Sequence, residues 1–167
     1  MPLLDPHRAG ALVTKKHLEY LQMRYINDII VHCSGTKAID GYGVEQIREY
    51  HKNEKHWADI GYHYVVTTDG QWQKGRPVSR IGAHCLKHNA HSIGVCYVGG
   101  LDENGQFADT RTPAQKATLL KEIYNLVQMY RCSVHGFSDY NKEEPGPGFD
   151  AHAEYGSIYK RLLEGKK

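Results

Sequence analysis

The chain has 167 residues, of which 40% are hydrophobic, and this suits one domain with a buried core rather than two. Its net charge of +2, with no block of lysine or arginine, argues against direct binding to nucleic acid. No apolar run is long enough for membrane insertion. The stretch MPLLDPHRAGALVTKK lacks the apolar segment of a secretory signal, so we expect a cytoplasmic protein.

The N-terminal part of the chain predicts a helix, a buried strand and a second helix. TKKHLEYLQMRY (14–25) is typical of a short helix with Thr14 as its N-cap. We expect residues 1–25 to form a helical extension outside the main domain. INDIIVHC (26–33) is rich in β-branched residues and predicts a buried strand. VEQIREYHKNE (44–54) has apolar residues at helical spacing and predicts a helix.

The central part of the chain predicts a hairpin, a strand and a long helix. GYHYVVTTDGQWQKG (61–75) alternates like a strand and then turns at Asp69-Gly70. HSIGVCYVGG (91–100) is a second apolar strand that ends at paired glycines. The helix begins at Thr112-Pro113, with Thr as the N-cap and Pro in the first helical position, and runs to about Tyr130.

The C-terminal part predicts a strand, a loop and a final helix. CSVHG (132–136) is a short strand, and GFSDYNKEEPGPGFD (136–150) carries too much proline and glycine for a helix or a central strand. AHAEYGSIYKRLL (151–163) predicts the last helix. Because strands alternate with helices, we predict the α/β class: one domain over residues 26–167, with a central mixed β-sheet flanked by helices.

The four cysteines form neither a Cys-x-x-Cys pair nor a zinc-ribbon spacing, so we expect free thiols. Three of them, Cys33, Cys96 and Cys132, lie in or beside apolar strands and are expected to be buried. Cys85 lies in a loop and could be exposed.

Three segments at strand ends carry residues that could do chemistry. His32 closes an apolar strand, where a neutral imidazole could bind a metal or simply bond to a loop carbonyl. Tyr62 begins the next strand, where a tyrosine is more often a packing residue. Lys142 and Glu144 lie two residues apart in the loop 136–150 and, taken alone, are typical of solvated charges.

Six stretches of sequence occur together in the order of a known family. They are IIVHCSGTK, VEQIREYHKNE, DIGYHYVVTTDG, IGAHC, HSIGVCYVGGLDENGQF and TPAQ. In these stretches the chain resembles the type-two zinc N-acetylmuramoyl-L-alanine amidases, the family that includes the peptidoglycan-recognition proteins. The resemblance covers about residues 26–150 and is strongest to the phage endolysins that are called lysozymes by custom.

The resemblance implies the amidase fold and hydrolysis of the amide between N-acetylmuramic acid and L-alanine in peptidoglycan. Family members hold one zinc with two histidines and a cysteine or aspartate, and the zinc activates the attacking water. His32 matches the first zinc histidine, and Tyr62 matches the catalytic tyrosine. His84 matches a histidine of the substrate groove.

The loop 136–150 matches the family in part. Lys142 takes the place of the catalytic lysine and Glu144 that of the third zinc ligand. Alignment on Pro147 instead places Gly146 at the third position, but we prefer the first alignment because it keeps Lys142, Pro145 and Gly146 in step. The family's Gly-His-x-Asp pattern, which carries the second zinc histidine, is here Gly136-Phe137-Ser138-Asp139, and phenylalanine has no lone pair for zinc.

Two functions follow from this departure. The first is a zinc amidase that acts on the cell wall if it is released and that has a substitute ligand, for which the nearby side chains are His135, Asp139, Glu143 and His152. The second is a pseudo-enzyme that binds muropeptide, or a protein partner such as a phage RNA polymerase, with little or no zinc. A phenylalanine ring in place of an imidazole favours weak zinc binding in either case.

Overall fold

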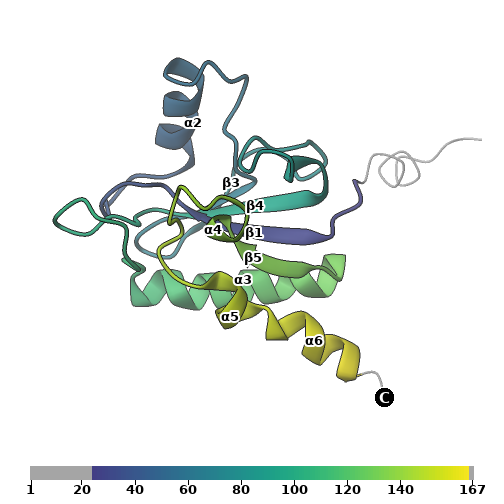
Figure 1. Ribbon diagram of the computed structural model, residues 1–167. Coiled ribbons are helices and arrows are strands. Elements are labelled where there is room, and N and C mark those ends of the chain that lie inside the picture. Colours follow the sequence, from purple (N-terminus) through teal and green to yellow (C-terminus); the bar gives the residue numbers. More distant parts are fainter. Residues whose placement is uncertain (1–23, 166–167) are drawn as a thin grey trace, which may run out of the picture.

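Five strands form one mixed sheet at the centre of the computed structural model, which describes residues 24–165 (Figure 1). The strands are β1 Asp28–Cys33, β2 Tyr64–Val66, β3 Trp72–Lys74, β4 Ser92–Tyr97 and β5 Ser133–Gly136. Their order across the sheet is β3-β2-β4-β1-β5. β1 pairs in parallel with β4 and β5, β2 pairs in parallel with β4, and the edge strand β3 runs antiparallel to β2.

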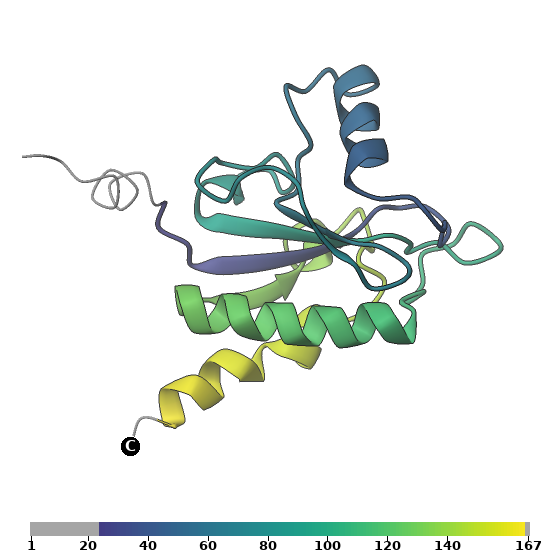
Figure 2. The ribbon, with the colours of Figure 1, turned by 180° about the vertical axis from the view of Figure 1, so that it is seen from behind.

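Helices cover both faces of this sheet, which confirms the predicted fold class. They are α2 Val44–Asn53, α3 Pro113–Tyr130, α4 Phe137–Tyr140, α5 Ala151–Tyr155 and α6 Ser157–Glu164, with a short 3-10 turn at Asn89–His91. Figures 1 and 2 show α2 on one side of the sheet and α3 on the other, with α6 packed against α3. In the described part of the chain, no helix combines the length and the apolar character that crossing a membrane requires.

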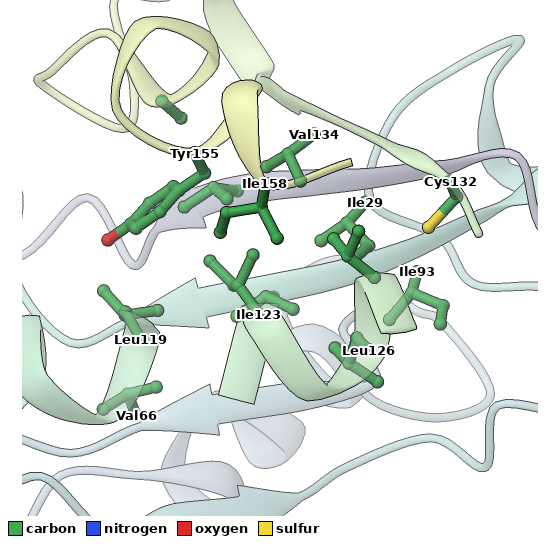
Figure 3. Packing of buried hydrophobic residues seen from close by; sticks show 14 of the residues in the cluster. Ile29, Val66, Ile93, Leu119, Ile123, Leu126, Cys132, Val134, Tyr155 and Ile158 are labelled. Atoms are coloured by element: carbon green, nitrogen blue, oxygen red, sulfur yellow. The ribbon is translucent and has the colours of Figure 1, made fainter. Parts of the chain in front are cut away.

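The larger core lies between the sheet and α3. All six residues of β1 and all six of β4 are buried, as expected for central parallel strands that are covered on both faces. Figure 3 shows Ile29 and Ile93 of the sheet packed near Ile123 of α3, with Ile158 of α6 above them. Each such fully buried aliphatic side chain contributes about 1.5–3 kcal/mol to folding.

The start of α3 is fixed by the residues that the sequence singled out. Thr112 accepts a hydrogen bond from the Gln115 amide at 3.1 Å, and the Gln115 side chain accepts one from the Thr112 amide at 2.9 Å. The Gln115 side chain, fully buried, also donates to the carbonyls of Val66 and Val98 at 3.2 and 2.9 Å. The cap thus ties α3 to the ends of two strand segments.

A smaller core on the opposite face determines where the candidate site lies. Val44 and Ile47 of α2 pack with Val65 and Cys96 of the sheet. His32 is the register partner of Cys96, and partners on adjacent strands point to the same face. The imidazole of His32 is therefore directed to the α2 side, away from α3.

Three local expectations were wrong. Residues 137–140 form the single helical turn α4, because the prolines and glycines come later and the Asp139 carboxylate caps the Gly136 amide at 2.9 Å. The C-terminal helix is divided at Gly156 into α5 and α6. Cys85 is buried like the other three cysteines, and all four are free thiols as predicted. The predicted helix 14–25 lies almost wholly outside the described residues, so the N-terminal extension stays a prediction.

Candidate functional site

A cleft of about 710 Å³ opens on the α2 side of the sheet. Four of the predicted site residues line it, together with Phe137: they are His32, Tyr62, His84 and Glu144. They come from β1, the segment before β2, the loop after residue 82 and the loop after α4. The structure therefore brings together four segments that are far apart in sequence, in a cavity large enough for a small-molecule or peptide ligand.

His32 and His84 form a hydrogen-bonded pair at the floor of the cleft. The Nε2 atom of His32 lies 2.8 Å from Nδ1 of His84, and the two rings are perpendicular. Burial lowers the pKa of His32 to about 3 and that of His84 well below its usual value, the latter helped by the neighbouring histidines. Both imidazoles are therefore neutral at neutral pH.

Ser92 fixes which nitrogen of each ring carries the proton. Its hydroxyl donates to the carbonyl of His88 at 2.7 Å, so its oxygen accepts from Nε2–H of His84 at 3.2 Å. Nδ1 of His84 is then an acceptor, and Nε2–H of His32 must donate to it. We assign this ordered chain from His32 through His84 to Ser92 on the hydrogen-bond network.

Gly94 and Asn89 place His84 within reach of His32. A Cβ at Gly94 would lie 2.6 Å from the His84 ring, so only glycine lets the ring rest on β4. The Asn89 side chain accepts hydrogen bonds from the amides of His84 and Cys85, both at 2.9 Å, which shapes the loop. The sequence offered the Gly94 signal, an isolated glycine inside an apolar strand, but nothing that paired it with His84.

Tyr62 reaches the cleft because β2 begins only at Tyr64. Its ring lies 5.1 Å from that of His32 and 5.5 Å from that of His51, and it packs in the α2-side core. Tyr64, two residues later, packs on the α3 side instead. Burial raises the pKa of Tyr62 well above its usual value, so the phenol stays protonated and can donate a hydrogen bond to a ligand.

Phe137 closes the other side of His32. Its ring lies 4.9 Å from the His32 ring at an interplanar angle of 33°. It is the first residue of α4 and follows β5 directly, so the parallel pairing of β5 with β1 sets its position beside β1. An apolar ring thus occupies the place where the resemblance expects an imidazole.

Of the residues in the loop after α4, some line the cleft and others do not. Glu144 lines the cleft but is exposed, and Lys142 is exposed with its ammonium 3.3 Å from the carbonyl of Ser138. Lys142 is not among the residues that line the cleft. Gly146 is buried in the lining, and its carbonyl accepts from the Ser138 amide at 2.8 Å.

Three of the four suggested substitute ligands are engaged elsewhere. The Nδ1 atom of His135 lies 2.9 Å from the Asp28 carboxylate, and the His135 ring stacks on that of His152 at 4.6 Å. Nδ1 of His152 donates to the carbonyl of Val134 at 2.8 Å. Asp139 caps α4. Over residues 24–165, no three His, Cys, Asp or Glu side chains gather as a metal-binding group, so the donors present do not fit zinc.

Aromatic side chains that sequence reasoning passed over form part of the cleft wall. Tyr50 and Trp57 lie at its α2 end, and the Lys55 ammonium lies 5.9 and 5.8 Å from their rings. Tyr42 and Phe107 also line the cleft. Their signal in the sequence was weak, because aromatic residues near a helix are usually packing residues.

Comparison with known proteins gives a consistent result. The model of the family described as N-acetylmuramoyl-L-alanine amidase matches residues 22–147. The endolysin of Escherichia phage T7 is 39% identical over 117 residues, which cover 70% of this chain and 77% of that protein. The endolysin of Enterobacteria phage T3 is 43% identical over 106 residues, or 64% and 70% of the two chains. The structure of the amidase LysC from Clostridium intestinale superposes with a TM-score of 0.68 at 25% identity, covering 85% of this chain and 88% of that one.

Proposed function

The chain belongs to the N-acetylmuramoyl-L-alanine amidase family, and on this premise we propose that its cleft recognises the muramoyl-peptide linkage of peptidoglycan. By family it is an endolysin-like peptidoglycan hydrolase. Family membership also implies zinc, for which the donors around His32 are too few. Recognition of the linkage is the part of the family's activity that the geometry supports best.

The observation that carries this proposal is the convergence of His32, Tyr62 and His84 on one cleft. A muropeptide presents a sugar, amide groups and the methyl groups of lactyl and alanyl units. The neutral phenol of Tyr62 supplies a hydrogen-bond donor, while Trp57 and Phe137 supply apolar faces. Apolar faces combined with a few fixed polar groups are the usual form of a small-ligand site.

Hydrolysis of the linkage is the activity that family membership gives this chain. It is favoured by the retention of His32 and Tyr62 as close neighbours, at the positions that match the family's zinc histidine and catalytic tyrosine. It requires a group that activates water, and general bases work best when their pKa lies near the working pH. The three histidines that line the cleft, His32, His51 and His84, all have pKa values well below neutral. Lys142 would have to leave Ser138 to stabilise an oxyanion there.

Titration with N-acetylmuramoyl-L-alanyl-D-isoglutamine tests recognition, and mass spectrometry of the same mixture tests hydrolysis. Trp57 lines the cleft, so its fluorescence should change on saturation. The other tryptophan, Trp72, stacks on Tyr64 at 4.4 Å, outside the cleft lining, and Trp72→Phe leaves Trp57 as the only tryptophan reporter. L-Alanyl-D-isoglutamine without the sugar is the matched control ligand. Equal affinity for both ligands, or no saturation with either, would contradict the proposal.

Two further expectations stay predictions. A protein partner such as an RNA polymerase rests on the resemblance to phage members of the family alone. A cytoplasmic protein that reaches the wall on release rests on the N-terminal sequence alone. Pull-down of the full chain against a purified polymerase is the direct measurement for the first.

A further inference from the structure

We infer that the cleft of this chain binds its ligand without a metal ion, because Phe137 and Gly146 stand at two of the three metal-ligand positions. The inference deepens the proposed function and rests on it only for the identity of the ligand. It also assigns the third position to Gly146 in place of Glu144, the residue that the sequence alignment favoured.

The three positions are direct neighbours in space. The rings of His32 and Phe137 lie 4.9 Å apart. The carbonyl of Gly146 accepts a hydrogen bond from the amide of Ser138, the residue after Phe137, at 2.8 Å. A Cβ at Gly146 would lie 3.4 Å from the sulfur of Cys33, the residue after His32. Positions 32, 137 and 146 are therefore neighbours that come from three chain segments.

The chemistry at these positions excludes a tight zinc site. Zinc in proteins takes nitrogen, sulfur or oxygen ligands, and even a catalytic zinc keeps three of them. The Phe137 ring offers no lone pair, and Gly146 has no side chain. His32 donates its Nε2–H to His84 in the assigned network, so it would offer a metal only the lone pair of its Nδ1 atom.

The side chains of Glu144 and Cys33 lie near these positions but do not replace the ligands that are missing at 137 and 146. Glu144 is one exposed carboxylate, and His32 with Glu144 would give at most two ligands, one fewer than a catalytic zinc site keeps. Cys33 lies beside Gly146 and lines the cleft, but its side chain packs with the core on the α3 side.

Position 146 can accept a ligand side chain without rebuilding the loop. The atoms nearest to a Cβ added at this glycine would be the Cys33 sulfur at 3.4 Å and the Phe107 ring at 3.8 Å, which are ordinary contacts. Gly146 is also outside the set of glycines that need a positive φ. Phe137→His with Gly146→Cys should therefore create a set of two histidines and one cysteine at these positions.

The test compares metal content in the parent chain and in two double variants. Each is purified with micromolar zinc under a phosphine reductant, because a cysteine at 146 would lie next to Cys33, and is then dialysed and assayed by plasma mass spectrometry. We expect the parent to hold well below one zinc per chain and Phe137→His/Gly146→Cys to hold about one. Phe137→Leu/Gly146→Ala changes the same positions without adding donors and should match the parent. Cobalt(II) should give thiolate charge-transfer absorption only in the first variant.

Stoichiometric, dialysis-resistant zinc in the parent overturns the inference, and so does a folded His/Cys variant that binds no more zinc than the Leu/Ala variant. Circular dichroism shows whether the His/Cys variant folds. If it does not fold, the zinc content of the parent alone decides. Muropeptide titration of the parent with and without EDTA separates this inference from the proposed function. Failure to bind in both conditions counts against the proposed function, whereas binding that EDTA abolishes counts against the metal-free cleft.

Discussion

Gly94→Ala should destabilise the protein and loosen the cleft at the same time. The added Cβ would lie 2.6 Å from the His84 ring, whereas ordinary contacts begin at 3.4 Å, so the ring must retreat by about 0.8 Å. Overpacking of this kind costs about 1–3 kcal/mol. The retreat also strains the hydrogen bonds from His84 to His32 and Ser92, each worth about 1 kcal/mol. We expect a loss of about 2–4 kcal/mol in the free energy of unfolding.

Urea denaturation gives this free energy from the transition midpoint. Replacing glycine by alanine where the backbone allows it ordinarily stabilises a protein by about 0.4–1 kcal/mol, so the sign of the change is diagnostic. Gly146→Ala is the matched control, because its Cβ makes only ordinary contacts, and it should change stability by less than about 1 kcal/mol. A Gly94→Ala protein as stable as its parent would refute the packing of His84 on β4, and with it the assigned hydrogen-bond chain.

Three further outcomes are expected. Ser92→Ala removes the acceptor of His84 Nε2–H at a buried position. It should lower the free energy of unfolding by about 1–3 kcal/mol and weaken muropeptide binding. Unchanged affinity and stability would contradict the hydrogen-bond chain from His32 through His84 to Ser92. Thr112→Ala should cost about 1 kcal/mol in urea denaturation through loss of the α3 cap, and no change would contradict the cap. His51 and His63 have folded-state pKa values of about 4 against about 6.5 unfolded, so the unfolded chain gains protons first as pH falls. Stability should therefore drop from pH 6.5 towards pH 4, by up to about 1.4 kcal/mol per pH unit for each histidine, and a flat profile over that range would contradict their buried neutral state.

The regular elements followed from local sequence because local physics fixes them. β1 and β4 are apolar along most of their length, as buried parallel strands must be. The start of α3 depends on neighbours in sequence, since Thr112 and Gln115 cap each other and Pro113 suits the first turn. α4 was missed because the density of proline and glycine was judged over the whole loop, while a single Asp139 cap is enough for one turn.

The sequence predicted which residues belong to the site, but not how they contact one another. The resemblance supplied His32, Tyr62 and His84, and the structure places them at one cleft. The hydrogen-bond chain through Ser92 could not be derived, because it depends on which strand residues face one another. The sequence alignment favoured Glu144 over Gly146 as the third position, although a loop rich in proline and glycine allows both alignments.

A single titration addresses the central claim that this cleft recognises peptidoglycan fragments without a metal. Trp57 fluorescence is followed as N-acetylmuramoyl-L-alanyl-D-isoglutamine is added to chelator-treated protein, and again after one equivalent of zinc is restored. Our account predicts saturable binding with the same dissociation constant in both samples. Binding that vanishes after chelation and returns with zinc would contradict it.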